Sequence, residues 1–220
     1  MIIEQLISPI VPTLLPSDTG SYALDKMEAA HLTQLPMVKE KQYMALIQET
    51  DVLDWSTPEH ALDGADFLNY KPAVFAGGHP FDALRMAHEQ NLTIVPVVDS
   101  GNNYMGAITR DDLLKYITEN SGLDNPGGIL VLEMEARNYS LTEIARLCEN
   151  EDVLVISTQL TDNVATGLLE VTLKTNRTNL EAVVSSFERH GYTVKEVFGA
   201  QSGQEDIMAR YASLMNYLNV

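Results

Sequence analysis

Three polar residues in one short segment have the types and spacing that could bind a sugar phosphate. Thr109, Arg110 and Asp112 follow the run 104–108, at the point where a strand would give way to a helix. A carboxylate can accept hydrogen bonds from two ribose hydroxyls, and a hydroxyl three residues earlier can donate to a phosphate oxygen near the helix N-terminus. Arg110 adds a guanidinium, which can bind phosphate by two parallel bonds. The segment predicts a nucleotide-type site; the competing interpretation is that Thr109 and Asp112 only cap the helix.

This segment belongs to a duplicated unit. Many residues recur sixty positions later in the chain, and a single inserted residue after Val38 then moves the offset to sixty-one. A register kept through apolar and turn positions alike, with one slip in a loop, indicates an internal repeat. The matching pairs include Pro12 and Pro72, Ala23 and Ala83, Pro36 and Pro96, Tyr43 and Tyr104, Ile47 and Ile108, and Asp51 and Asp112.

Both repeats predict the element order β-α-β-β-α. In the first, apolar spacing and turn residues predict a helix at 22–30, strands at 34–38 and 43–48, and a helix from about residue 50. In the second, they predict a helix at 80–90, strands at 94–98 and 104–109, and a helix at 111–117. The glycines at 77–78, just before the helix at 80–90, fit either a turn or a loop that offers backbone N–H groups to an anion.

The polar chemistry of the two repeats differs at the strand-to-helix corner. Gln48 stands where the second repeat has Thr109, and Glu49 stands where it has Arg110, although Asp51 keeps the carboxylate of Asp112. A carboxylate close to a phosphate is unfavourable, whereas a guanidinium binds it. We therefore expect the site around Thr109 and Asp112 to bind, and the one around Gln48 and Asp51 to be weak or empty.

The remainder of the chain has a different pattern. Turn residues at 124–128 indicate a linker, and the segments after it predict the order β-α-β-β-α-β, which is the ferredoxin-like arrangement. An amphipathic pattern from 204 to 217 predicts a last helix, packed on its own domain or on a partner. The predicted organisation is a first repeat at 1–60, a second at 61–122, a linker at 123–128, a ferredoxin-like domain at 129–199 and a C-terminal helix at 200–220.

Composition excludes several classes of function. The net charge of −17 in 220 residues disfavours nonspecific binding to nucleic acid or to anionic membranes, which relies on basic patches. No apolar run approaches the roughly 20 residues of a membrane span, and the acidic, proline-interrupted N-terminus does not resemble a secretory signal, so we expect a cytoplasmic protein. The single cysteine, Cys148, fits a packing role in a helix. The five histidines lack metal-ligand spacing, and no motif for a nucleophile and base occurs, so we expect neither a metal site nor an enzyme.

Residues 94–99 and 104–114 together resemble a CBS domain, and with the first repeat they resemble a CBS pair, or Bateman module, over roughly residues 1 to 120. Residues 129–199 are similar in element order to an ACT-type domain. The combination is similar to the acetoin utilisation regulator family, in which a CBS pair precedes an ACT-like domain. The implied fold class is α/β (α+β): two tandem CBS β-α-β-β-α repeats followed by a ferredoxin-like, ACT-like domain.

The resemblance also implies a function. CBS pairs bind adenine nucleotides or related adenosyl compounds such as AMP, ADP, ATP or S-adenosylmethionine, and their Thr/Ser-x-x-Asp motif corresponds here to Thr109 and Asp112. Val95 and Pro96, on the strand beside that motif, would contact the base through the backbone or would pack in the core. The resemblance further implies a homodimer. The alternative is a structural or interaction module that does not bind a ligand and dimerises through its CBS and ACT-like parts.

The ACT-like segment departs from its family at one loop. The family's ligand loop contains glycine, whereas residues 136–140 read Ala-Arg-Asn-Tyr-Ser. Arg137 and Asn138 could bind a carboxylate, or the loop could form only a turn and the cap of the next helix.

Overall fold

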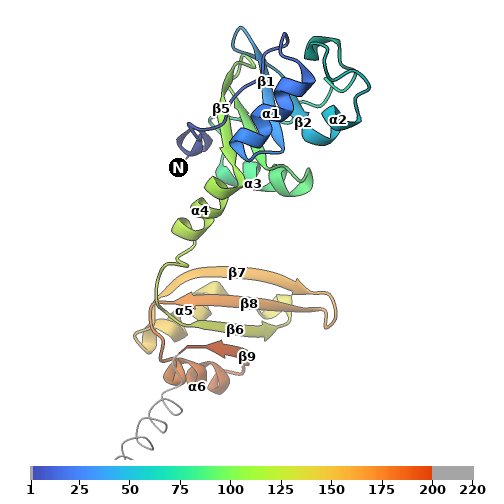
Figure 1. Ribbon diagram of the computed structural model, residues 1–220. Coiled ribbons are helices and arrows are strands. Elements are labelled where there is room, and N and C mark those ends of the chain that lie inside the picture. Colours follow the sequence, from blue (N-terminus) through green and yellow to red (C-terminus); the bar gives the residue numbers. More distant parts are fainter. Residues whose placement is uncertain (1, 200–220) are drawn as a thin grey trace, which may run out of the picture. The chain divides into compact units, whose positions relative to one another are not determined.

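The computed structural model describes residues 2–199, which fold as two compact units that divide between residues 117 and 118 (Figure 1). The first unit contains both repeats, and the second contains the ferredoxin-like domain. The predicted C-terminal helix lies outside the described residues. No helix in the described part of the chain is both long and apolar enough to cross a membrane.

The first repeat forms a two-stranded antiparallel sheet. One helix precedes the two strands in the sequence, and another follows them. After a short 3₁₀ helix, η1 (Ile3–Leu6), the elements are α1 (Gly20–Ala30), β1 (Gln34–Lys39), β2 (Gln42–Gln48), α2 (Glu49–Asp54) and a second 3₁₀ turn, η2 (Leu62–Gly64). Thr19 caps α1, because its hydroxyl accepts a hydrogen bond from the backbone of Tyr22 at 3.2 Å. The helix therefore begins two residues earlier than the sequence predicts, directly after this cap.

The second repeat has the same elements, preceded by one additional strand. Its elements are β3 (Val74–Phe75), α3 (Pro80–Glu89), β4 (Ile94–Val98), β5 (Tyr104–Thr109) and α4 (Arg110–Asn120), and the sheet order is β3-β4-β5. The strands at 94–98 and 104–109 begin and end as predicted. Pro80 occupies the first turn of α3, where the missing N–H costs nothing.

The β-α-β-β-α order predicted for the first repeat is wrong at its first element, which is a single bridge and not a strand. Where the second repeat has β3 paired in parallel with β4, the first has a single parallel bridge between Leu14 and Met37. Leu14 and Val74 are sixty residues apart, as are Met37 and Val97, so the bridge marks the equivalent position. Pro12 and Pro16 flank Leu14 closely, and prolines cannot donate to a sheet, so pairing does not extend.

The two repeats contact each other through equivalent residues. The rings of Tyr43 and Tyr104 stack with centroids 6.3 Å apart, and the hydroxyl oxygens of Thr33 and Thr93 lie 3.4 Å apart. Each contact joins a residue to its own counterpart in the other repeat. Contacts between equivalent residues arise where an approximate twofold axis relates the two repeats. The structure therefore agrees with the duplication inferred from the sequence.

Each repeat is built on its own core, but the larger core contains residues from both. Tyr43 and Leu46 of the first repeat and Ile3 of the N-terminal segment are buried with the apolar residues of the second repeat. The smaller core joins α1, β1, β2 and α2, and the ring of Trp55 packs against it, edge to face with Phe67 at 5.6 Å. The sequence has only one tryptophan.

The second unit is a four-stranded antiparallel sheet with two helices, arranged as the ferredoxin-like order predicts. Its elements are β6 (Ile129–Met134), η3 (Ala136–Asn138), α5 (Leu141–Asn150), β7 (Val155–Asn163), β8 (Leu168–Thr175), α6 (Glu181–Arg189) and β9 (Thr193–Phe198). The strand order is β7-β8-β6-β9. Alternate residues of β6 and β8 face the helices, and Leu132, Val171 and Phe187 lie at the centre of this core. The fold class is therefore mixed α and β in both units.

Two helix ends in this unit are set by a glycine and by a serine. Gly191 follows α6 with φ of +81°, the left-handed conformation expected of a glycine after a helix. Ser140 accepts a hydrogen bond from the backbone of Glu143, as in a capping box, but the Glu143 carboxylate binds Arg146 instead of returning to Ser140. The return bond of a full capping box is thus replaced by an ion pair between Glu143 and Arg146.

Candidate functional site

The corner between β5 and α4 brings Thr109 and Asp112 into direct contact. The Thr109 backbone N–H and hydroxyl donate to Asp112 Oδ2 at 3.0 and 2.5 Å, and the Asp112 backbone N–H donates to the Thr109 hydroxyl oxygen at 3.1 Å. This is a reciprocal cap of α4, so the capping interpretation describes the corner as it stands. The Asp112 carboxylate uses one oxygen in both bonds that it accepts, which leaves Oδ1 for an external donor.

Arg110, next to this corner, points toward the end of α3. Its guanidinium donates to the backbone oxygen of Leu92 from Nε at 3.2 Å and from Nη2 at 2.8 Å, and Nη2 also reaches Asn91 Oδ1 at 3.2 Å. The chain turns there through the left-handed conformation, with φ of +51° at Asn91. A phosphate at the corner would have to compete with the Leu92 carbonyl for this guanidinium.

Val95 and Pro96 lie on β4, directly beside the last residues of β5. Val95 pairs with Ile108 and Pro96 with Ala107, and both side chains are buried. Val95 is 1% exposed and belongs to the core of the second repeat. Their side chains therefore act in packing, which leaves only their backbone atoms for contact with a ligand.

At the equivalent corner of the first repeat, between β2 and α2, two glutamine side chains form hydrogen bonds in place of the threonine hydroxyl. Gln48 donates to Asp51 Oδ2 at 3.4 Å and accepts from Gln34 Nε2 at 3.3 Å. Gln34 is buried, and its Oε1 accepts from the backbone N–H and the hydroxyl of Thr93 in the second repeat, at 2.8 and 3.2 Å. A chain of polar contacts thus runs from Asp51 to the other repeat.

Sequence inspection did not select Gln34, although a signal was present. Its counterpart in the second repeat is Ile94, a fully buried core residue, so a glutamine at this position breaks the apolar pattern of the duplicated strand. A buried amide needs hydrogen-bond partners, which Gln48 and Thr93 provide. The break in the pattern therefore marks a polar link between the two corners.

The loop with Gly77 and Gly78 forms a turn that is engaged by the N-terminal segment. The backbone N–H of Gly78 donates to Phe75 at 2.9 Å, and the carbonyls of Ala76 and Gly78 accept from Glu4 and Ile3 at 3.0 and 3.1 Å. The Gly78 N–H is already used within the turn. Of the two interpretations of the glycine pair, the turn is the one observed.

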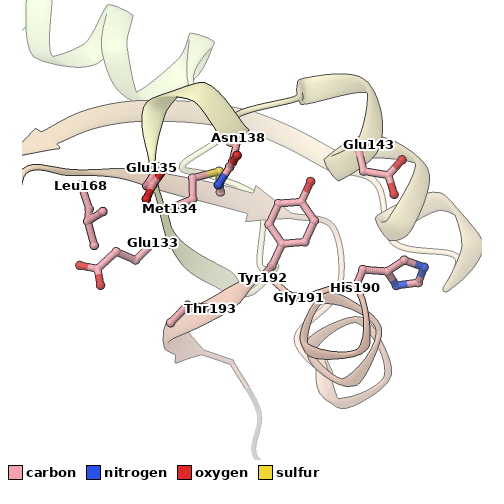
Figure 2. Close-up of a pocket in the computed structure, with 10 residues that line it drawn as sticks. All are labelled: Glu133, Met134, Glu135, Asn138, Glu143, Leu168, His190, Gly191, Tyr192 and Thr193. Atoms are coloured by element: carbon pink, nitrogen blue, oxygen red, sulfur yellow. The ribbon is translucent and has the colours of Figure 1, made fainter.

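A separate pocket of about 510 Å³ opens in the second unit, between the end of β6, the start of α5 and the connection from α6 to β9 (Figure 2). In Figure 2 the Tyr192 ring lies between Glu143 and His190 on one side and Glu133 and Leu168 on the other. The lining residues are Glu133, Met134, Glu135, Asn138, Glu143, Leu168, His190, Gly191, Tyr192 and Thr193.

The pocket is lined by three glutamates, each of which is paired with a basic residue. Glu133, Glu135 and Glu143 pair with Lys195, Arg137 and Arg146 respectively, and Arg146 holds the pKa of Glu143 below its usual range. Arg137 therefore faces Glu135, and residues 136–138 form the short helix η3. This arrangement favours the turn-and-cap interpretation of the loop over a site for a carboxylate.

The single cysteine is buried, and no metal-binding cluster occurs in the described residues. Burial raises the pKa of the Cys148 thiol to about 11, and the side chain is 1% exposed within the core of the second unit, as its helical position predicted. Within residues 2–199 there is no cluster of three or more histidine, cysteine or acidic residues that could hold a metal ion.

The segment that carries the Thr109 corner has a counterpart among known families. Residues 69–119 match the CBS domain family. The CBS match spans the second repeat from before β3 to the last turn of α4, so it includes Thr109, Arg110 and Asp112. The first repeat lies outside the CBS match and is related to it by the internal symmetry described above.

Solved structures similar to this chain include several CBS-pair proteins. A CBS domain pair/ACT domain protein from Thermotoga maritima is 19% identical, with 54% of this chain and 98% of that chain covered and a TM-score of 0.48. CBSX2 from Arabidopsis thaliana, in complex with AMP, is 19% identical over 54% of this chain and 96% of that chain, with a TM-score of 0.47. The cytosolic domain of the Mg²⁺ channel MgtE, in complex with ATP, is 19% identical over 50% and 46%, with a TM-score of 0.43.

Proposed function

We propose that this chain is a cytoplasmic regulatory protein, acting as a homodimer, that senses an adenine nucleotide or adenosyl compound through a CBS pair formed by its two repeats. Residues 1–60 and 61–122 are the two repeats of this pair, and residues 129–199 are an ACT-like domain, as in the acetoin utilisation regulators. The ligand binds at the corner of Thr109 and Asp112.

The observation that carries the proposal is the Thr109–Asp112 pair at the N-terminus of α4, inside the segment that matches the CBS domain. Asp112 Oδ1 can accept from a ribose hydroxyl while Oδ2 keeps the cap. The Thr109 hydroxyl can turn from Asp112 to a phosphate oxygen, and the first N–H groups of an eleven-residue helix favour negative charge at the same place. Val95 and Pro96 offer backbone atoms for the base.

The first repeat supports a single occupied site. Gln48 occupies the position of Thr109 but donates to Asp51, and Glu49 brings a negative charge where the second repeat has Arg110. The Asp51 corner therefore has an amide in place of the hydroxyl, and a phosphate would meet a like charge. We propose one strong site per chain, with the Asp51 corner weak or empty.

A second candidate function is a structural or interaction module without a ligand. The observation that favours it is that Thr109, Asp112 and Arg110 all have partners within the chain. Because these polar groups are already hydrogen-bonded, the corner needs no ligand, and its role could be limited to ending a strand and beginning a helix. Nucleotide binding separates the two functions directly.

The test is a thermal-shift panel of adenosine, AMP, ADP, ATP, S-adenosylmethionine and NAD, followed by calorimetry on any compound that stabilises the protein. A ligand at about 100 times its dissociation constant adds about 2.7 kcal/mol to the free energy of unfolding. We expect one compound to bind with a stoichiometry of one per chain. Stabilisation by none of them would favour the interaction module, and two equal sites per chain would contradict the asymmetry.

Two equivalent substitutions locate the site. Asp112→Asn keeps an oxygen for the cap but removes the carboxylate charge, so we expect the ligand-induced shift to be lost. Asp51→Asn makes the same change at the matching position of the first repeat and should leave the shift intact. Each shift is measured against the melting temperature of the same variant without ligand. Retained binding in Asp112→Asn would move the site elsewhere.

A further inference from the structure

The two corners differ in the side chain that lies beside them on the preceding strand. Gln34 of β1 pairs in register with Gln48, and Ile94 of β4 pairs in the same way with Thr109. Both positions are buried, and Gln34 is only 5% exposed. The first corner therefore has an amide at the place where the second has an aliphatic side chain.

The orientation of the Gln34 amide is fixed by its partners. The backbone N–H and the hydroxyl of Thr93 both donate to Gln34 Oε1, at 2.8 and 3.2 Å, and a backbone N–H can only donate. Gln34 Nε2 therefore faces Gln48, whose Oε1 accepts at 3.3 Å, and Gln48 Nε2 donates in turn to Asp51 Oδ2 at 3.4 Å. Each bond sets the direction of the next, from the second repeat to the Asp51 carboxylate.

The counterpart of this contact at the second corner lacks an acceptor. Thr33 is the counterpart of Thr93, and their hydroxyl oxygens lie 3.4 Å apart. Ile94 can accept no hydrogen bond, and the Thr33 backbone N–H makes none within the part of the chain that the structure describes. The second corner thus keeps a donor unused at the position where Gln34 uses the donor of the first.

We propose that the Gln34 amide is an internal ligand of the Asp51 corner, which fills the place of a nucleotide base there and limits the two repeats to one nucleotide per chain. The inference rests on the proposed function and adds to it the residue that closes the first corner. An amide presents an acceptor beside a donor, which is also the pattern of adenine at N7 and N6. Gln34 supplies the polar edge of such a base from within the chain.

The competing explanation is that the amide only stabilises the fold. The second repeat argues against a general need for it, because Ile94 occupies the same position of the duplicated strand and is fully buried. With isoleucine at position 34, the Thr93 N–H would be left as the Thr33 N–H is at the second corner. The amide is therefore a feature of the first corner and not of the duplicated fold.

The experiment counts nucleotides per chain by calorimetry on the full-length protein, with AMP, ATP and S-adenosylmethionine as separate probes. One variant combines Gln48→Thr with Glu49→Arg, which gives the first corner the hydroxyl and the guanidinium of the second and keeps Gln34. The other variant adds Gln34→Ile. For the probe that the wild type binds, we expect one molecule per chain in the wild type and in the double variant, and two in the triple variant.

The double variant is the matched control, because it differs from the triple variant only at Gln34. Two molecules per chain in the double variant would overturn the inference, since the corner would then be open with the amide in place. One molecule per chain in a folded triple variant would also overturn it. In both cases binding by the wild type would still support the proposed function.

A second measurement needs no nucleotide, and it decides the case in which the wild type binds none of the probes or the triple variant does not fold. Gln34→Ala removes the amide and leaves its space. Acetamide, which corresponds to the atoms removed, should raise the melting temperature of Gln34→Ala and leave that of the wild type unchanged. Acetone has a similar shape but no N–H donor, so it should raise the melting temperature less. Equal effects of acetamide on the two proteins, or of acetamide and acetone on the variant, would overturn the inference.

Discussion

Single residues show how far the duplicated positions have diverged. Tyr43 and Tyr104 stack on each other, and burial raises the pKa of both hydroxyls above the ordinary value. The Tyr43 hydroxyl donates to the backbone oxygen of Pro72 at 2.9 Å. The Tyr104 hydroxyl oxygen is buried and, within the described residues, has no hydrogen-bond partner. Equivalent side chains in one stack therefore differ in a single hydrogen bond.

This difference predicts opposite effects of the same substitution. Tyr43→Phe should lower the free energy of unfolding by about 1 kcal/mol or more, because Pro72 loses its donor. Tyr104→Phe should be neutral or slightly stabilising, since it removes a buried polar atom without a partner. Urea denaturation of both variants checks this. Equal losses in the two would show that the hydroxyls have equivalent environments.

Much of the candidate corner was predictable from sequence at this scale, and the reason is local. Thr109 and Asp112 are three residues apart at a strand-to-helix boundary, so their contact follows from the geometry of one helical turn. The direction of Arg110 could not be predicted, because it depends on the carbonyl of Leu92 at the end of another helix. Whether the corner binds a nucleotide remains a prediction.

At the scale of elements, the N-terminal segment and β5 fit together through a glycine. Ser8 pairs with Ala107, and Ile7 lies so close to Gly106 that a Cβ on the glycine would be 2.2 Å from Ile7 Cγ2. Gly106 also has φ of +145°, which L side chains rarely adopt. Both the space and the backbone conformation require glycine here.

A pair of glycine variants separates these two requirements. Gly191→Ala changes a residue with φ of +81° and no neighbour within 4 Å, so it should cost only the conformational strain, about 1 to 2 kcal/mol. Gly106→Ala should cost more because of the overlap with Ile7. Adding Ile7→Ala to Gly106→Ala should cost less than the sum of the two single changes. Thermal unfolding of the wild type and the four variants measures this, and strict additivity would argue against the contact.

Element order was predictable wherever the apolar period was clear. The strands at 94–98 and 104–109 have the predicted limits, because turn residues bound each of them. The first strand expected in the first repeat is absent from the described residues, since the prolines around Leu14 limit pairing to one bridge. Strand β7 extends to Asn163, because the polar end of the strand pairs with β8 instead of forming a loop.

At the scale of the whole molecule, the two units have separate cores and separate electrostatics. On the second unit, Lys195 lies 2.5 Å from Glu170 and 3.9 Å from Glu133. Lys195, with Asn163 beside it, holds the pKa of Glu170 below its usual range. The only tryptophan, Trp55, is in the first unit. Unfolding of the first unit can therefore be followed by Trp55 fluorescence, and unfolding of the second by hydrogen exchange of its strands.

Acid should destabilise the second unit partly through Glu170. Its lowered pKa means that the folded state gains stability from the charged form above the unfolded pKa, about 4.3, and loses it as the pH falls through the lower folded pKa. Glu170→Gln removes this contribution, so the second unit of the variant should lose less stability between about pH 5 and pH 3. Hydrogen exchange of the β8 amides reports this change. Trp55 fluorescence should titrate alike in both proteins, and a difference there would mean that the substitution acts on the first unit.

The shared core of the first unit has a consequence for the history of the duplication. Ile3, Tyr43 and Leu46, all from the N-terminal half, are buried among residues of the second repeat, and Leu46 is hydrogen-bonded to the chain at Tyr70. Once each copy had come to bury part of the other, neither could be deleted without exposing the survivor's interior. Residues at the corners could still change in one copy, as Gln48 and Glu49 differ from Thr109 and Arg110, whereas loss of a whole copy would unfold the unit. The two halves have become different in their chemistry and inseparable in their folding.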